Sequence, residues 1–186
     1  VILGDTGTLQ YNDNVLPQAK AFGLDRVGEI VTLQYNRVDL TQAASMGLGG
    51  AADIITSGEG NKIVLTGAGD DQITLGNGNS DIVSDNGILD YAEQVFSADN
   101  SVSGDDVIVA GDGEHRVLAG SGSDSIKLGI GNNDILADTG TLDYTAGTFT
   151  ADELGDGDDI VITGLGDQRI LGGYGADSIT TTDGND

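Results

Sequence analysis

Single β-branched residues recur along most of the chain, set among small and polar residues at a spacing of nine. Ile or Val stands at every one of eleven such positions: Ile55, Val64, Ile73, Ile82, Ile108, Val117, Ile126, Ile135, Val161, Ile170 and Ile179. Four residues before each of them stands a Gly, with Ala51 as the exception. Glycine permits the positive φ angles of tight turns, and an isolated β-branched residue suits a short, half-buried strand. The pattern therefore predicts short strands joined by glycine-rich turns around a narrow core.

A longer repeat of 53 residues contains the nine-residue pattern. The segments DIVSDNGILDY (81–91) and DILADTGTLDY (134–144) are 53 residues apart, and the chain opens with the similar VILGDTGTLQY (1–11). Repeats of this length are typical of stacked repeat folds. Two strands and two turns would form a coil of about eighteen residues, whose strands pair in parallel with those of the next coil. We interpret each unit as three coils, of which the third is irregular.

These patterns predict an all-β chain that folds as a parallel β-roll or β-solenoid. The expected parts are the tail of a preceding repeat (1–12), an insertion (13–47), two repeat units (48–100 and 101–153) and a partial third unit (154–186). We expect the insertion to be a loop or hairpin, with EIVTLQY (29–35) as its best strand. In the irregular coil, we expect a strand with Leu89 and Tyr91, followed by a long return loop over 92–105.

Composition narrows the classes of function. The net charge of -24 comes from 31 acidic and 7 basic residues, which argues against a nucleic-acid partner and against an anionic membrane surface. The sequence has no cysteine and no apolar run long enough to cross a bilayer. Because it begins and ends in mid-repeat, we expect it to be a segment of a longer protein.

The glycine-rich turns resemble a known family. GGYGADSIT (172–180) is similar at every defined position to the nonapeptide of RTX, or haemolysin-type, calcium-binding repeats. TGAGDDQIT (66–74) and AGSGSDSIK (119–127) match after one Gly substitution. The resemblance covers residues 48–91, 101–144 and 154–186, and it leaves out the insertion.

The resemblance implies a parallel β-roll in which Ca²⁺ lies between turns eighteen residues apart on one edge. The ligands would be turn carbonyls and the Asp at the sixth motif position, which agrees with the preference of Ca²⁺ for six to eight oxygen donors. The implied edge partners are Asp53 with Asp71, Asp106 with Asp124, and Asp159 with Asp177. The implied turn glycines are Gly67, Gly69, Gly120, Gly122, Gly173 and Gly175.

The intervening turns depart from the motif. At the motif position for Asp, these turns carry Lys62, His115 and Gln168. Along the opposite edge, the expected pairs are Lys62 with Ser80, His115 with Asn133, and Gln168 with Asp186. An ammonium group repels a cation and offers no acceptor. We therefore expect one Ca²⁺ site per unit, about three in all, along a single edge.

Several residues allow two interpretations. Further sites near Asp81 and Asp134, or near Asp85 and Asp138, stay open, although Asp85 with Asn86 and Gly87 is also typical of a plain turn. Asp70, Asp105 and Asp158 are either ligands or turn formers. We expect His115 to be a surface turn residue, and Tyr91 and Tyr144 to cover the core rather than to bind a sugar.

The function that follows is calcium-dependent architecture. Without metal the Asp-rich turns repel one another, so we expect binding and folding to be coupled. The resemblance implies a bacterial protein exported unfolded, and we expect a stiff segment of a large secreted or cell-surface protein, such as an adhesin, with cell-surface or matrix ligands bound by the parent. The alternative is the RTX tail of a secreted enzyme or toxin. Catalysis on acidic polysaccharides and ice binding are less favoured, and we expect no catalytic residues.

Overall fold

The computed structural model describes residues 2–3, 7–11, 40–45, 50–152 and 157–186, and only the backbone of the first three ranges. Within these residues the protein is all-β, with eighteen short strands. The described residues contain no helix that could span a membrane. The all-β class and the many parallel strands are those that the sequence pattern predicts.

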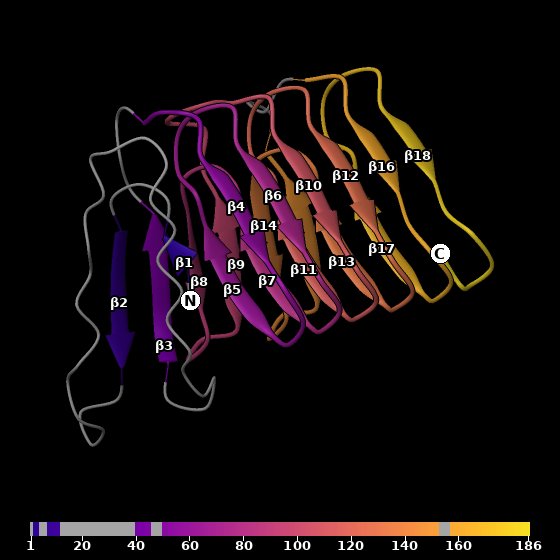
Figure 1. Ribbon diagram of the computed structural model, residues 1–186, viewed down its shortest axis with the longest axis horizontal. Coiled ribbons are helices and arrows are strands. Elements are labelled where there is room, and N and C mark those ends of the chain that lie inside the picture. Colours follow the sequence, from indigo (N-terminus) through magenta and orange to yellow (C-terminus); the bar gives the residue numbers. More distant parts are fainter. Residues whose placement is uncertain (1, 4–6, 12–39, 46–49, 153–156) are drawn as a thin grey trace.

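Twelve strands form two parallel sheets, and the chain passes from one to the other along its length (Figure 1). The first parallel sheet contains β4 (Ile54–Ser57), β6 (Gln72–Leu75), β10 (Val107–Ala110), β12 (Ser125–Leu128), β16 (Ile160–Ile162) and β18 (Ser178–Thr180). The second parallel sheet contains β1 (Ile2–Leu3), β5 (Lys62–Leu65), β7 (Ser80–Val83), β11 (His115–Leu118), β13 (Asn133–Leu136) and β17 (Gln168–Leu171).

The register of these sheets stacks the predicted β-branched residues on one another. Ile73 lies opposite Ile55 on one side and opposite Ile108 on the other. Nine of the eleven residues are buried in one continuous cluster, and Ile170 packs against it. Ile179 is 45% exposed because β18 lies at the end of its sheet. Since each buried Ile or Val contributes about 1.5–3 kcal/mol, stability depends on stacking between neighbouring coils.

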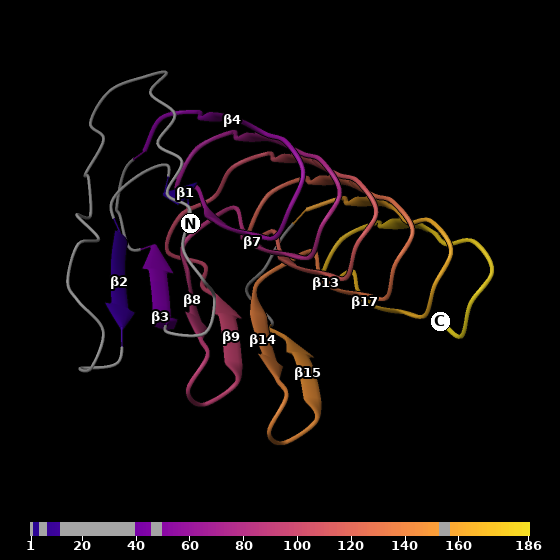
Figure 2. The same ribbon diagram turned by 60° about the horizontal axis from the view of Figure 1, so that its bottom comes forward.

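The expected third coil is instead a β-hairpin, which corrects the sequence interpretation. β8 (Gly87–Asp90) pairs antiparallel with β9 (Val95–Ala98), and β14 (Gly140–Asp143) pairs likewise with β15 (Thr148–Ala151). The hairpins project from the parallel sheets (Figure 2) and join β2 (Gly7–Tyr11) and β3 (Leu40–Ser45) in a six-stranded antiparallel sheet. Each unit is therefore two coils and one hairpin.

Two local features explain the hairpin. Asp90 Oδ1 accepts the backbone N–H groups of Ala92 and Glu93 at 3.0 and 2.9 Å, which closes a tight turn where we expected a long loop. Leu89 pairs with Phe96 across the hairpin, and both are fully buried against Leu118 and other residues of the second parallel sheet. Most of the expected insertion, including 29–35, lies outside the described residues, but β3 pairs antiparallel with β2 and β8.

Glycine-to-alanine changes at three turn positions should separate backbone strain from steric overlap. Gly58→Ala should change the free energy of unfolding by less than about 0.5 kcal/mol, since no atom beyond its two chain neighbours lies within 4 Å of the added Cβ. Gly60→Ala should cost about 1–2 kcal/mol, because φ is +99° although the space is open. Gly122→Ala should cost more than about 3 kcal/mol, since φ is +132° and the Cβ would overlap the carbonyl oxygen of Gly104. Urea unfolding in excess calcium would measure the series, and equal losses at Gly60 and Gly122 would contradict the overlap.

Candidate metal centre

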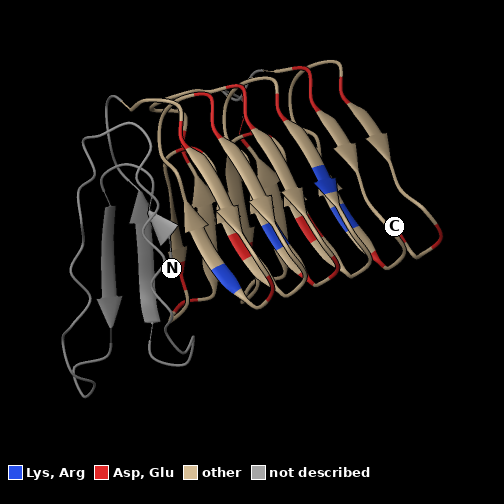
Figure 3. Cartoon of the chain, in the orientation of Figure 1, with Lys and Arg blue, Asp and Glu red and all other residues tan. Residues whose placement is uncertain are grey.

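Six aspartates form a continuous row along one edge, where the glycine-rich turns enter the first parallel sheet. We call this row, which comprises Asp53, Asp71, Asp106, Asp124, Asp159 and Asp177, the aspartate rim. The backbone N–H of each member donates to Oδ1 of the next, at distances of 2.7, 2.8, 2.8, 2.8 and 3.1 Å in chain order. Figure 3 shows acidic residues in red recurring along this edge.

The rim brings together more residues than the sequence predicted. The expected partners, eighteen residues apart, are neighbours in every case. Asp71 and Asp106 are also neighbours, as are Asp124 and Asp159, although each of these pairs is 35 residues apart. The hairpins cause this contact, because they remove residues from the coil and leave the turns on either side adjacent. The row is therefore continuous rather than divided into isolated pairs.

The second carboxylate oxygens of the rim are buried and unpaired. Asp71, Asp106, Asp124 and Asp159 are at most 2% exposed. Oδ2 of each, and that of Asp53, has no hydrogen-bond partner among the described residues. An ionised carboxylate in such a place is unstable unless a cation or a proton neutralises it.

The pKa values of the rim carboxyls express this instability. Burial, the largest cause, raises the pKa of Asp71 to about 8, that of Asp106 to about 7, that of Asp124 to about 9 and that of Asp159 to about 7. Repulsion from neighbouring aspartates adds to the shift at each position. Burial also raises the pKa of Asp53. The rim thus holds buried oxygen donors with raised proton affinity.

The six glycines that the sequence assigned to the site all have left-handed φ angles: Gly67 (96°), Gly69 (126°), Gly120 (111°), Gly122 (132°), Gly173 (105°) and Gly175 (131°). They allow the turn backbones to stack closely, as the overlap of a Cβ at Gly175 with the carbonyl oxygen of Gly157 shows. Among the described residues, no three Asp, Glu, His or Cys side chains converge as a ready metal cage. A Ca²⁺ ion at the rim would thus need backbone carbonyls from these turns to complete its shell.

The residues just before the rim aspartates form a second, exposed row. Asp70 Oδ1 accepts the N–H of Asp105 at 3.1 Å, Asp105 Oδ1 accepts that of Ser123 at 2.9 Å, and Asp158 Oδ1 accepts that of Ala176 at 2.8 Å. Their side chains lie in solvent. Of the two interpretations left open for Asp70, Asp105 and Asp158, this geometry favours turn formation.

The opposite edge repeats the same kind of bonding with amide side chains at its centre. Asn133 Oδ1 accepts the N–H of His115 at 3.0 Å, and Asn133 Nδ2 donates to Gln168 Oε1 at 2.8 Å. Gln168 in turn donates its backbone N–H to Asp186 at 3.1 Å, and the Lys62 ammonium donates to the carbonyl of Gly60. Asn133 and Gln168 satisfy each other here, and none of the buried carboxylate oxygens without a partner in the described part of the chain belongs to this edge.

The expectation for His115 was wrong, because this residue is buried rather than a surface turn residue. Its Nε2 lies 3.0 Å from the carbonyl oxygen of Gly111. Burial lowers the pKa of the imidazole. His115 belongs to the packed interior of the opposite edge.

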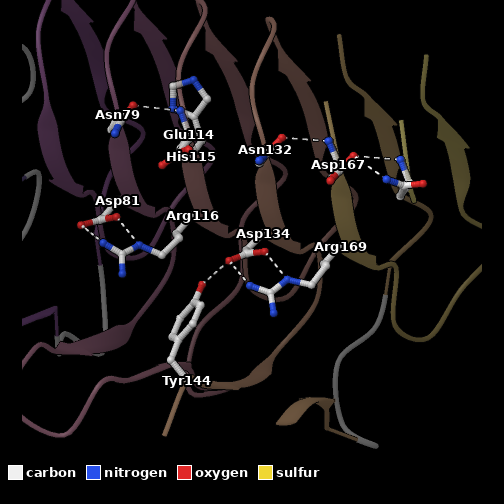
Figure 4. Close-up of a pocket in the computed structure, with 11 residues that line it drawn as sticks. Asn79, Asp81, Glu114, His115, Arg116, Asn132, Asp134, Tyr144, Asp167 and Arg169 are labelled. Atoms are coloured by element: carbon white, nitrogen blue, oxygen red, sulfur yellow. Dashed lines mark hydrogen bonds and ion pairs between the residues drawn. The ribbon is translucent and has the colours of Figure 1, made fainter. Parts of the chain in front are cut away.

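Asp81 and Asp134 serve a structural role that disfavours calcium binding there. Arg116 binds Asp81 through two hydrogen bonds of 2.6 and 2.9 Å, and Arg169 binds Asp134 through two of 2.7 Å (Figure 4). The hydroxyl groups of Tyr91 and Tyr144 donate to the same carboxylates at 2.7 and 2.6 Å. Both ion pairs and Tyr144 line a polar cavity of about 570 Å³. Each carboxylate is already neutralised by its own guanidinium.

The same groups attach the hairpins to the second parallel sheet. Tyr91, Phe96, Tyr144 and Phe149 make successive edge-to-face contacts with centroid separations of 5.2, 5.5 and 5.3 Å. The guanidinium of Arg116 lies 4.6 Å from the centroid of Phe96, and that of Arg169 lies 4.2 Å from Phe149. Tyr91 and Tyr144 pack against the second hydrophobic cluster, which confirms the prediction that they cover the core.

The two arginine pairs should differ in their effect on stability. Arg116→Met should lower the free energy of unfolding by about 3–5 kcal/mol, because it strands a buried carboxylate: the side chains of Arg116 and Asp81 are 17% and 3% exposed. Arg169→Met should cost about 1 kcal/mol or less, since its side chain is 57% exposed. Urea unfolding would compare them, and Asp81→Asn added to Arg116→Met should recover part of the loss. Equal costs would contradict the burial argument.

Comparison with protein families, with curated proteins and with solved structures found no match for this chain.

Proposed function

We propose that this chain is a calcium-binding, RTX-type segment of a parallel β-roll, and that it folds when Ca²⁺ binds. The observation that carries the proposal is the row of buried, unpaired Oδ2 atoms along the aspartate rim. Carboxylate and carbonyl oxygens are the ligands that Ca²⁺ prefers, and glycine-rich turns place both kinds at this edge. The asymmetry of the edges supports it, since on the opposite edge the Asn133 amide accepts the backbone N–H of His115 and pairs with the Gln168 amide.

Calcium would supply the charge that the folded chain lacks. With a net charge of -24 and four rim carboxylates almost fully buried, the metal-free folded state is opposed by both repulsion and desolvation. Extracellular calcium modules have dissociation constants of about 10⁻⁴–10⁻³ M. At ten times such a value, each site adds about 1.4 kcal/mol, so about three sites would add roughly 4 kcal/mol. That is enough to decide folding in a marginal domain.

The setting that suits such sites is outside the cell, where calcium reaches the required concentration. We propose that the segment is a stiff, repeated spacer of a large secreted or cell-surface bacterial protein, such as an adhesin. Its coils stack their cores into one line, so added units would extend the structure without a new fold. The parent protein would bind cell-surface or matrix ligands, and this segment would act without catalysis.

A calcium titration followed by circular dichroism and by equilibrium dialysis tests the proposal. The unmodified chain should gain strand signal as calcium rises to millimolar concentrations, and it should bind several ions. Asp71→Ala, Asp124→Ala and Asp177→Ala together should shift the midpoint at least about tenfold, equivalent to about 1.4 kcal/mol.

The matched control changes Asp70, Asp105 and Asp158 to Ala, which removes the same charge from the exposed row. Its midpoint should shift less than about threefold, since these carboxylates are solvated turn groups. A chain that is fully folded in chelator and binds no calcium would overturn the proposal.

A further inference from the structure

Each hairpin leaves the coil next to an aspartate that the repeat motif does not contain. Asp85 occupies the turn position that Gly67 and Gly120 occupy in the neighbouring coils, and Asp138 is its counterpart 53 residues later. A Cβ at Gly120 would overlap the side chain of Asp85, and one at Gly173 would overlap that of Asp138. The neighbouring glycines thus leave the space that these carboxylates fill.

Asp85 is completely buried and only half paired. Its Oδ2 accepts the backbone N–H of Ser121 at 2.9 Å. Its Oδ1 has no hydrogen-bond partner among the described residues, and neither has the hydroxyl of Ser121, which is 9% exposed. An aspartate that only forms a turn is either exposed to solvent or accepts hydrogen bonds from nearby backbone with both carboxylate oxygens. Turn formation alone therefore does not explain why Oδ1 of Asp85 is buried without a partner.

The unpaired oxygen of Asp85 belongs to a cluster with the aspartate rim. The charges of Asp106 and Asp71 both act on Asp85, whose pKa rises to about 9, mainly through burial. Oδ2 of Asp106 and Oδ2 of Asp71 are also buried and unpaired. Among the described residues, Asp85 Oδ1 and the Ser121 hydroxyl are thus two buried oxygens without a hydrogen-bond partner, and the charge of Asp106 acts on the carboxyl group of Asp85. Only a cation or several bound protons can neutralise such a group.

We propose that Asp85 is a calcium ligand, and that with Asp106, the Ser121 hydroxyl and backbone carbonyls of the adjoining turns it forms a hairpin-base site, distinct from sites made by the nonapeptide turns alone. At this turn the hairpin interrupts the six-residue glycine loop, so fewer loop carbonyls are available. A carboxylate at the second turn position would replace the missing oxygen donors. The site rests on the proposed function, since it shares rim aspartates.

The second unit contains an aspartate at the same place, with Tyr174 where the first unit has Ser121. Asp138 Oδ2 accepts the backbone N–H of Tyr174 at 2.6 Å, as Asp85 accepts that of Ser121. The charge of Asp138 acts on Asp159, the rim aspartate of the same turn. We therefore assign a second hairpin-base site to Asp138 and Asp159, without the hydroxyl ligand that Ser121 would supply in the first unit. The chain holds two such sites, one for each complete hairpin of the repeat.

Calcium stoichiometry of the full chain tests the assignment. In saturating calcium, Asp85→Asn should bind one ion fewer than the unmodified chain, Asp138→Asn one fewer, and the double variant two fewer, as measured by equilibrium dialysis. Asparagine keeps the acceptor for the Ser121 N–H and mimics a protonated carboxyl. If Asp85 were only a neutral turn residue, the stoichiometry would not change, and that result would overturn the assignment.

A second variant guards against misfolding of the first. Asp85→Gly restores the motif residue of the neighbouring turns and adds no polar atom. It should fold in calcium, as judged by circular dichroism, and still bind one ion fewer. An unmodified chain that binds calcium while both Asp85 variants retain every ion refutes only the hairpin-base site. An unmodified chain that binds no calcium refutes the proposed function as well.

Discussion

Replacing Asp71, Asp106 and Asp159 by Asn should let the chain fold without calcium. Asparagine keeps the Oδ1 acceptor for the neighbouring backbone N–H and removes three buried charges. In chelator at pH 8, the thermal midpoint should rise by more than about 15 °C over the unmodified chain. That shift corresponds to roughly 4–8 kcal/mol for a chain of this size. Circular dichroism during heating would measure it.

The matched control is the triple change of Asp70, Asp105 and Asp158 to Asn. Each of these residues immediately precedes one of the rim aspartates, so the change in net charge and the region of the chain are the same. Because these side chains are exposed, the midpoint should rise by less than about 5 °C. Equal shifts in the two variants would show that general repulsion, and not burial at the rim, opposes folding of the metal-free chain.

The sequence predicted those features that depend on one repeating position. The nine-residue spacing of Ile and Val correctly predicted nine residues of one buried cluster. In a strand, a β-branched residue between polar neighbours is most stable when its side chain faces the core. The six turn glycines were also found, since positive φ strongly restricts the residue type. The rim aspartates follow the same register, and their alignment on one edge was therefore predictable.

The hairpins and the continuity of the rim could not be found in this way. The turn after β8 is closed by Asp90 and contains none of the Asn-Gly or Asp-Gly pairs that announce a hairpin. Pairing of Leu89 with Phe96 depends on the second parallel sheet, which no local pattern describes. Once the hairpins leave the coil, Asp71 meets Asp106 across 35 residues, a contact outside any eighteen-residue period.

The role of Asp81 was also hidden in the sequence. Its partner Arg116 is 35 residues away and lies beside it only because β7 pairs with β11. The 53-residue repeat of Asp, Tyr, Phe and Arg at 81, 91, 96 and 116 is visible in the sequence, and it recurs at 134, 144, 149 and 169. Because an Asp and an Arg recur together at this fixed spacing, the repeat could have indicated an ion pair between them.

In the metal-free chain, the free energy of unfolding should fall as the pH rises from about 4 to 9. The pKa values of Asp71, Asp106, Asp124 and Asp159 lie at about 7 to 9 in the folded state, above the usual 3.8. The folded state therefore binds more protons than the unfolded state within this window. Their contribution to stability is full below the unfolded pKa and is lost as the pH rises through the folded values. His115, with a lowered pKa, has the opposite effect below its usual 6.5, but it is one group against these four and against Asp53 and Asp85, whose pKa values are also raised.

Calcium should reverse this dependence, because the metal competes with protons for the same oxygens and binds only the ionised form. In millimolar calcium, stability should rise between pH 5 and pH 8, where metal-free stability falls. Urea unfolding at a series of pH values, with and without calcium, would measure both slopes. In the Asp71, Asp106 and Asp159 to Asn variant both slopes should flatten, whereas in the Asp70, Asp105 and Asp158 variant both should persist. Parallel slopes with and without calcium would show that the buried rim carboxylates do not exchange protons for metal.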